Sequence, residues 1–425
     1  MLGRHIRCAS RAAVAGAVTV LFALSARPAP APAQLAQPPG LPATPPGGAA
    51  GARAPAVNRR IEARKAPALV LTPAWVTDLE DAAVQAPAAD ETHGYVVLRS
   101  SGLAALDLGT GAVAWKKPFD RVAASPLAAS GLVFVAHGRE VEAVESSSGA
   151  RRWVATLDGP PSAPLLAGPG RLFAFTRSHT AVALRAGTGE TLWTRTFGTA
   201  TPAHVASGSG ALYCALDDGR VVALDAVSGA TRWASTLPSA ATAIASAGDR
   251  VIIGGKDKFL YCLSASRGKI AWRRRAGGAA VGSIASDGRR LYYAALDNVL
   301  RAIDRRHGQQ IWKAALSHRP VGGVVLSGRL LWVAGLAAEV AAFQPIDGSA
   351  AGRSPVAGDL SVAPAWRGGD GTATGGVFVV TGDGRAQWLV PGPAPLAAKP
   401  IPGLPIDPPF AARGWPGGRP PGSDR

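Results

Sequence analysis

Clustered catalytic and metal-binding residues are scarce in this sequence. Its 425 residues include three cysteines, seven histidines and 28 acidic residues, and they contain no paired carboxylates, no histidine-rich metal spacing and no nucleophile motif. A site built on such a motif is therefore not predicted, although Asp and Glu from separate loops could still converge in the fold. Basic residues number 45, and no long run of like charge accounts for the net charge of +17. We therefore expect the basic excess to be spread along the chain.

The few cysteines exclude some forms of anchoring and cross-linking. Cys8 precedes the apolar N-terminal stretch instead of following it, so it is misplaced for the lipid-modified cysteine of a bacterial lipoprotein signal. A lipoprotein anchor is not expected. Cys214 and Cys262 are 48 residues apart, and we interpret them as buried free thiols, with a disulfide in an oxidising compartment as the alternative.

A sequence unit of about forty residues recurs along the chain. Its clearest copy is A-L-D-A-V-S-G-A-T-R-W at residues 223–233. The glycines of the unit follow one another at intervals of 38 to 40 residues, which is typical of a repeat architecture. The repeat glycines are Gly111, Gly149, Gly189, Gly229, Gly268, Gly308 and Gly348, and the repeat tryptophans are Trp75, Trp115, Trp153, Trp193, Trp233, Trp272 and Trp312.

Each repeat contains apolar runs broken by turn residues, which predicts four short strands, the number in a β-propeller blade. Gly229 and its equivalents supply the positive φ of a tight turn between the third and fourth strands. Asp107, Asp225 and Asp304 can bond the backbone of that turn. The tryptophan gives the outermost strand a large apolar plate to bury against the neighbouring blade. We interpret these residues as structural.

The two ends of the repeat region complement one another. Trp75 lies 40 residues before Trp115 but has no strands in front of it, whereas three strands within residues 360–390 lack a fourth. Joining them in one sheet closes the ring and leaves no unpaired end blade. The sequence predicts an all-β, eight-bladed β-propeller of four-stranded antiparallel blades over residues 70–390, with the ring closed by the N-terminal strand. Gly352 stands where six other repeats have Trp, so the seventh blade is expected to be weak.

The A-L-D-x-x-x-G-x-x-x-W consensus resembles the tryptophan-docking repeat of quinoprotein-type (PQQ-like) propellers over about residues 74–390. A WD-repeat protein fits less well, because no Trp-Asp dipeptide occurs. The family includes quinoprotein alcohol dehydrogenases and the BamB group of outer-membrane assembly factors. The resemblance therefore implies either a non-catalytic envelope scaffold or a quinone-binding dehydrogenase or sensor. Quinoprotein dehydrogenases hold Ca²⁺ with Glu, Asn and Asp over a vicinal cysteine pair, and this sequence shows neither feature, so no cofactor is predicted.

The N-terminus reads as an export signal. Arg4, Arg7 and Arg11 precede an apolar stretch at residues 12–26, and residues 31–33 offer a small-x-small cleavage site, which predicts a signal peptide over residues 1–33. The apolar stretch is short for a membrane span, and a retained, uncleaved anchor is the alternative. We expect a periplasmic or otherwise exported protein, with association to the outer membrane implied by the BamB-type resemblance.

Two further segments have a composition that cannot bury a core. Residues 34–69 are rich in Pro, Ala and Gly, and residues 391–425 are rich in Pro. We expect the first to be a disordered linker and the second a disordered tail. A short proline-rich ligand for a partner is an alternative role for the tail.

The innermost strands are expected to consist of small residues that suit eight strands converging on one axis. Among them only His204 is titratable, and we interpret it as a structural, hydrogen-bonded residue. No catalytic, cofactor-binding or metal-binding residue is therefore predicted. The six stretches lie at residues 122–129, 162–167, 201–207, 242–247, 281–286 and 321–327.

The outermost strands are basic, and charges on an edge strand discourage sheet-to-sheet association. Repeated around eight blades, they would also form a positive rim suited to an envelope protein or an anionic envelope surface. Arg273, Arg274 and Arg275 are the densest part of that rim and the predicted contact with an anionic partner. Nucleic acid is not an expected partner of an exported chain, and a monomer is expected. The preferred hypothesis is a non-catalytic scaffold for protein–protein interactions in the cell envelope; the alternative is a quinoprotein-type dehydrogenase or ligand sensor.

Overall fold

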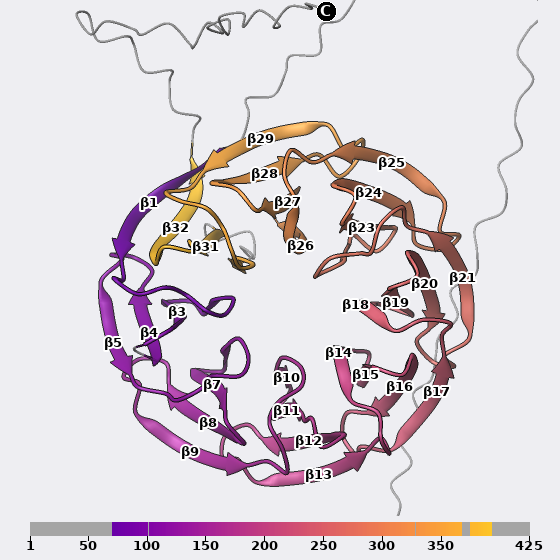
Figure 1. Cartoon of the computed structure of the whole chain (residues 1–425), viewed down its shortest axis with the longest axis horizontal. Helices are drawn as coiled ribbons and strands as arrows, with labels where there is room; N and C mark the ends of the chain where they lie inside the picture. The colour runs from indigo at the N-terminus through magenta and orange to yellow at the C-terminus, as the bar shows by residue number, and fades with distance from the viewer. Residues whose placement is uncertain (1–69, 101, 328, 368–374, 393–425) are drawn as a thin grey trace, which may run out of the picture. The chain divides into compact units, whose positions relative to one another are not determined.

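The computed structural model describes residues 70–100, 102–327, 329–367 and 375–392, which belong to one compact unit. These residues form eight antiparallel sheets of four strands each. Figure 1 shows the sheets standing as blades around a common axis. The predicted eight-bladed β-propeller is confirmed. The described residues contain no helix that could cross a membrane.

In the first four blades the strands run in chain order from the axis to the rim (Figure 1). Blade 1 contains β2 (Ala88–Ala89), β3 (His93–Leu98), β4 (Gly102–Asp107) and β5 (Val113–Lys117), and blade 2 contains β6 (Leu127–Ala129), β7 (Leu132–His137), β8 (Glu140–Glu145) and β9 (Arg151–Thr156). Blade 3 contains β10 (Leu166–Gly168), β11 (Arg171–Phe175), β12 (Thr180–Arg185) and β13 (Thr191–Thr196), and blade 4 contains β14 (Pro202–Gly208), β15 (Ala211–Leu216), β16 (Arg220–Asp225) and β17 (Thr231–Thr236).

The next three blades repeat this order. Blade 5 contains β18 (Ala241–Ala247), β19 (Arg250–Gly255), β20 (Phe259–Ser264) and β21 (Ile270–Arg275), and blade 6 contains β22 (Ala285–Ser286), β23 (Arg290–Ala295), β24 (Val299–Asp304) and β25 (Gln310–Ala315). Blade 7 contains β26 (Pro320–Ser327), β27 (Leu330–Gly335), β28 (Glu339–Phe343) and β29 (Ala350–Pro355).

Blade 8 joins the two ends of the propeller. Its inner strands are β30 (Ala365–Arg367), β31 (Gly376–Val380) and β32 (Arg385–Gly392), and its outermost strand is β1 (Val70–Asp78). β1 pairs with β32 in an antiparallel ladder that runs from Val70 opposite Gly392 to Asp78 opposite Arg385. The N-terminal strand therefore closes the ring, as predicted.

The terminal segments predicted from composition lie outside the described residues. These are the signal peptide at residues 1–33, the linker at residues 34–69 and the tail at residues 391–425, apart from the first two residues of the tail. β32 continues through Pro391 and Gly392, two residues beyond the boundary expected from composition.

Several inner strands are shorter than expected. β6 spans Leu127–Ala129 instead of residues 122–129, and β10 begins at Leu166 instead of residue 162. Pro126 and Pro164 precede these strands, and proline lacks the N–H that a ladder needs. β22 is also short, because Gly282 has a φ of 57° and departs from the extended conformation.

The hydrophobic core is divided among the blade interfaces. Eight clusters of buried residues each join two neighbouring blades. Tyr213 of blade 4, for example, packs in one cluster with Val251 and Tyr261 of blade 5. Because burial occurs between blades, the stability of the ring depends on how each blade docks on the next.

Candidate functional site

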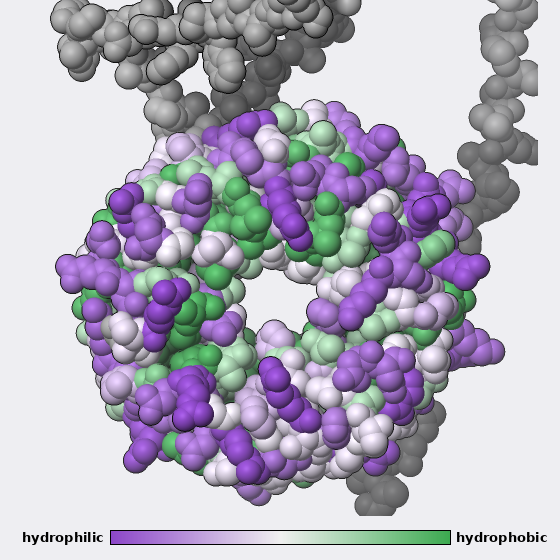
Figure 2. Space-filling model, in the orientation of Figure 1, coloured by the Kyte–Doolittle hydropathy of each residue, from purple (hydrophilic) through white to green (hydrophobic). Residues whose placement is uncertain are grey.

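The inner strands surround an opening at the axis, which Figure 2 shows as a gap through the space-filling surface. Their residues are mostly small, as in Ala88–Ala89 of β2. The ionisable residues on the described inner strands are His204 of β14 and Arg367 of β30. The pKa of His204 is lowered, because partial burial disfavours the charged ring and Lys256 repels it. Arg367 Nη1 donates to the Glu91 carbonyl at 2.9 Å, which ties blade 8 to blade 1.

The repeat tryptophans and glycines meet across the blade interfaces. The tryptophan ring of one blade covers the glycine in the turn between the third and fourth strands of the next blade. Gly229 has a φ of 70°, and a Cβ added there would lie 2.7 Å from the ring of Trp193. Any larger residue would meet both backbone strain and the ring. The seven pairs are Trp75–Gly111, Trp115–Gly149, Trp153–Gly189, Trp193–Gly229, Trp233–Gly268, Trp272–Gly308 and Trp312–Gly348.

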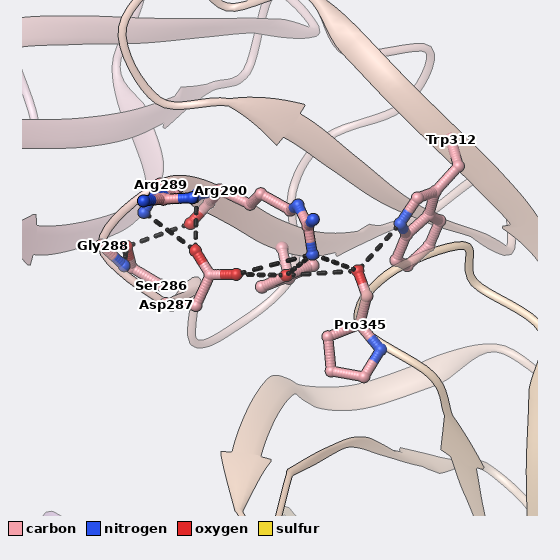
Figure 3. A network of polar contacts seen from close by, with 8 residues as sticks. Ser286, Asp287, Gly288, Arg289, Arg290, Trp312 and Pro345 are labelled. Carbon is pink, nitrogen blue, oxygen red and sulfur yellow. Dashed lines mark hydrogen bonds and ion pairs between the residues drawn. The ribbon is translucent and has the colours of Figure 1, made fainter.

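Each of these indoles also donates a hydrogen bond to the next blade. The acceptor is the carbonyl three residues before the docking glycine, and the distances run from 2.8 to 3.4 Å. Figure 3 shows the bond between blades 6 and 7, where the Pro345 carbonyl accepts from Trp312 Nε1 at 3.0 Å and from Arg290 Nη1 at 3.2 Å. The Tyr292 hydroxyl donates to Asp287 Oδ2 at 2.7 Å and lies 3.2 Å from the Pro345 carbonyl oxygen.

A second docking position lies two residues after the tryptophan, and sequence reasoning missed it. Four side chains at this position donate to the carbonyl of the docking glycine: Thr77 to Gly111, Lys117 to Gly149, Ser235 to Gly268 and Arg274 to Gly308. Lys117 Nζ also lies 2.8 Å from Glu142 Oε1, whose carboxylate is buried between blades 1 and 2. A donor two residues after the tryptophan is visible in the sequence, but the partner across the interface is not.

The aspartates of the repeat accept hydrogen bonds from their own turns. Asp225 Oδ1 accepts from the Ser228 N–H at 2.8 Å, and Asp107 Oδ1 accepts from the Thr110 N–H at 2.8 Å. The pKa of Asp225 is lowered, first by the hydrogen bond from Arg232 and then by those from Ser228. These carboxylates stabilise the turn that receives the tryptophan.

The sequence match covers the whole propeller. The family model described as outer membrane protein assembly factor BamB matches residues 72–212, 177–294 and 217–390. The chain belongs to the BamB family. No curated protein sequence matches the chain.

Solved structures share the fold of this BamB-family chain at low identity. BamB from Moraxella catarrhalis is 17% identical with a TM-score of 0.60, covering 75% of this chain and 97% of that chain. Quinohemoprotein alcohol dehydrogenase from Comamonas testosteroni is 13% identical with a TM-score of 0.60, covering 75% and 76%. Sqt1 from Saccharomyces cerevisiae is 12% identical with a TM-score of 0.65, covering 76% and 100%. At these identities the likeness shows the fold alone.

The residues at the axis of this BamB-family propeller do not fit a quinone with Ca²⁺. Calcium is held by several converging oxygen ligands, whereas the inner strands present Ala, Gly and Val where such ligands would stand. Within residues 70–100, 102–327, 329–367 and 375–392 no group of three or more His, Cys, Asp and Glu is placed to hold a metal ion. The two described cysteines are buried in different interface clusters, Cys214 between blades 3 and 4 and Cys262 between blades 5 and 6. Both are free thiols, and burial raises the pKa of Cys262 to about 12.

The three arginines predicted to contact an anionic partner have different surroundings. Arg274 is half-buried and donates to the Gly308 carbonyl at 3.1 Å, so it belongs to the blade interface. Arg273 and Arg275 are exposed, and the Arg273 guanidinium lies 5.8 Å from the centre of the Phe259 ring. Two of the three side chains are therefore available to a partner, as alternation along β21 requires.

The expectation that the basic excess is spread along the chain is wrong. Blades 5 and 6 with their linkers, residues 241–319, hold 15 basic and five acidic residues, a net charge of +10. The remainder of residues 70–392 holds 17 basic and 20 acidic residues, a net charge of −3. The basic residues of blades 5 and 6 form no long run in the sequence, so the asymmetry is visible only when charges are counted for each blade.

Proposed function

We propose that this chain is a non-catalytic, exported scaffold of the cell envelope that holds partner proteins during the assembly of outer-membrane proteins. The observation that carries the proposal is the match to the BamB family model from β1 to β32. The axis supports it, because its small side chains offer a reacting substrate neither converging acids and bases nor metal ligands. On this proposal the propeller supplies binding surface, and its repeat residues keep that surface rigid.

The proposal includes export to the periplasm with cleavage after Ala33. The mature chain would then begin at Gln34 and act as a monomer. N-terminal sequencing of the protein from a periplasmic fraction, with light scattering of the purified chain, tests both statements. A chain that retains Met1 and sediments with membranes would contradict cleavage.

Depletion of the protein in the cell that makes it tests the scaffold role. The amount of outer-membrane β-barrel proteins should fall, and expression of the full chain should restore it. A variant that cannot dock its blades, Trp233→Ala with Trp153→Ala, should restore it less well. Unchanged outer-membrane protein levels after depletion would contradict the proposal.

The quinoprotein alternative has its own test. Titration of the purified chain with pyrroloquinoline quinone and Ca²⁺ should give no saturable change in the visible spectrum, and dye-linked alcohol oxidation should stay at background. Micromolar saturation together with alcohol oxidation would replace the scaffold by a dehydrogenase.

A further inference from the structure

Ten exposed basic side chains of blades 5 and 6 have no ion-pair or hydrogen-bond partner among the described residues. We call them the blade 5–6 basic surface. They are Lys256, Lys258, Arg267, Lys269, Arg273, Arg275, Arg289, Arg306, Lys313 and Arg319.

The acidic residues of the same two blades already have partners. Asp297 forms a bidentate pair with Arg301, at 2.9 Å and 2.5 Å. Asp249 pairs with Arg250 and Arg305, and Asp287 with Arg290. Asp257 accepts a hydrogen bond from the Tyr261 hydroxyl, and Asp304 is hydrogen-bonded to His307. None of these carboxylates forms an ion pair with one of the ten free cations, whose side chains face solvent.

The ten cations occupy both faces and the rim of the ring. Lys256 and Lys258 lie in the turn between β19 and β20, on one face, whereas Arg267 lies in the turn between β20 and β21, on the other. Arg273 and Lys313 lie on β21 and β25, the outermost strands of the two blades (Figure 1). Figure 2 shows hydrophilic side chains projecting from this part of the rim.

Two exposed aliphatic side chains lie among these rim cations. Ile270 on β21 and Ile311 on β25 are each 47% exposed; Ile270 follows Lys269 in the sequence, and Ile311 lies two residues before Lys313. Basic side chains interleaved with exposed aliphatic ones are typical of surfaces that bind the headgroup region of a bilayer, where the charge meets phosphate and the aliphatic group enters the interface.

We propose that the blade 5–6 basic surface docks the ring edge-on against a bilayer containing anionic phospholipid. A bilayer is favoured over an acidic protein because the cations wrap around the edge from one face to the other. A planar surface approached edge-on meets the cations along β21 and β25 from one face of the ring to the other, whereas a partner seated on the loops of one face would leave most of them unused. Each Lys or Arg near such a surface contributes about 1 kcal/mol.

This docking is separate from the proposed scaffold role. A scaffold could bind its partners without touching lipid, and a lipid-docking propeller could serve another purpose. Lipid binding by the purified chain and outer-membrane protein levels after depletion therefore test the two statements independently.

The test is co-sedimentation of the full chain with vesicles of phosphatidylglycerol and phosphatidylcholine in equal parts. The variant Arg273→Ser/Arg275→Ser/Lys313→Ser removes three free cations from the rim of blades 5 and 6. The matched control Lys116→Ser/Arg151→Ser/Arg177→Ser removes three exposed, unpaired cations from blades 1 to 3, so both variants lose the same net charge. Neither substitution touches a docking contact, and equal melting temperatures will show that folding is intact.

We expect the blade 5–6 variant to partition roughly 100-fold more weakly than the unsubstituted chain, from about 1 kcal/mol for each residue. The control variant should lose less than about threefold, and vesicles of phosphatidylcholine alone should bind neither form. Equal losses in both variants would show that net charge acts without a defined surface, and no loss in either would also overturn the proposal. Binding to polyglutamate through the same three residues without binding to the vesicles would assign the surface to an acidic protein instead.

Discussion

Seven blade interfaces of this propeller are built in one way, and the interface between blades 7 and 8 is built in another. In the seven, a tryptophan covers the turn glycine of the next blade and donates to a carbonyl in that turn. At the eighth, Gly352 of β29 pairs with Ala342 at the register position that Trp233 holds opposite Ala223 in blade 4. The closing interface therefore lacks the docking tryptophan.

The difference follows from the way the ring closes. A docking tryptophan needs a turn between the third and fourth strands of the next blade. In blade 8 those strands are β32 and β1, which come from opposite ends of the propeller, so no turn joins them. A tryptophan at position 352 would have no turn to cover. The way the ring closes therefore explains why position 352 holds glycine instead of the repeat tryptophan.

Other contacts hold the closing interface. The buried Ser354 hydroxyl accepts from the Leu71 N–H at 2.7 Å, and the Gln387 side-chain oxygen accepts from the Ala357 N–H at 3.0 Å. The rings of Trp332 and Trp366 pack 5.8 Å apart. The comparison teaches that a docking residue persists only where its receiving turn exists, and that buried hydrogen bonds and packed tryptophan rings replace it at the seam.

Removal of β1 should have the largest effect, because it abolishes both the β1–β32 ladder and the docking of Trp75. A chain that begins at Asp81 should melt at least about 10 °C below the full chain or lose its single cooperative transition, since several kcal/mol are removed. A chain that begins at Ala68 and keeps β1 is the control. Equal melting of the Asp81 chain would show that β1 does not close the ring.

Trp233→Ala should be the most damaging single substitution at a docked interface. It removes a ring that is 8% exposed and a hydrogen bond of 2.8 Å to the Ala265 carbonyl. The free energy of unfolding in urea should fall by about 3–5 kcal/mol, the usual cost of Trp→Ala in a core. A loss below about 1 kcal/mol would mean that the tryptophan does not hold neighbouring blades together.

Gly229→Ala should cost about 3 kcal/mol, because it combines left-handed backbone strain with a clash against Trp193. Gly131→Ala separates the two causes: Gly131 has a φ of 74° but open space around its added Cβ. It should cost only the strain, about 1–2 kcal/mol. Equal losses in the two variants would remove the clash from the explanation.

Ser354→Ala should weaken the closing interface by about 1–3 kcal/mol, because it leaves the buried Leu71 N–H without its acceptor. Ser235→Ala, at the equivalent position of blade 4, removes a donor to the Gly268 carbonyl and should cost about 1 kcal/mol. Urea unfolding of both variants measures the difference. A smaller loss for Ser354→Ala would show that its hydrogen bond does not hold the closing interface.

The fold was predictable from the sequence because the turn glycines and docking tryptophans recur at a regular spacing. The spacing of Gly229, Trp233 and their equivalents indicates blades, and Trp75 at the same spacing indicates the closing strand. The contacts across the interfaces were not predictable in the same way. Periodicity shows that Arg274 lies two residues after a repeat tryptophan. It does not show that the Arg274 side chain reaches the Gly308 carbonyl, because that carbonyl lies 34 residues away in the sequence. Arg274 was therefore interpreted as part of the charged rim.

The structure differs from the prediction in its inner strands and in its charge distribution, for two physical reasons. Pro126 and Pro164 lie inside stretches whose small residues predict strands, but proline cannot donate to a ladder. The basic excess of blades 5 and 6 is dispersed in the sequence but concentrated in space, because neighbouring blades bring together residues that are about forty positions apart.

Amide hydrogen exchange around the ring tests most directly the claim that the closing interface is the seam of the propeller. The account predicts that amides of β29, β32 and β1 exchange through an opening that requires less free energy than global unfolding. Amides of β17 and the other docked outer strands should exchange more slowly, because a tryptophan holds each of them to the next blade. Equal protection of Ala350–Pro355 and Thr231–Thr236 would contradict the account, because it would show that the closing interface is as firm without a docking tryptophan as the other interfaces are with one.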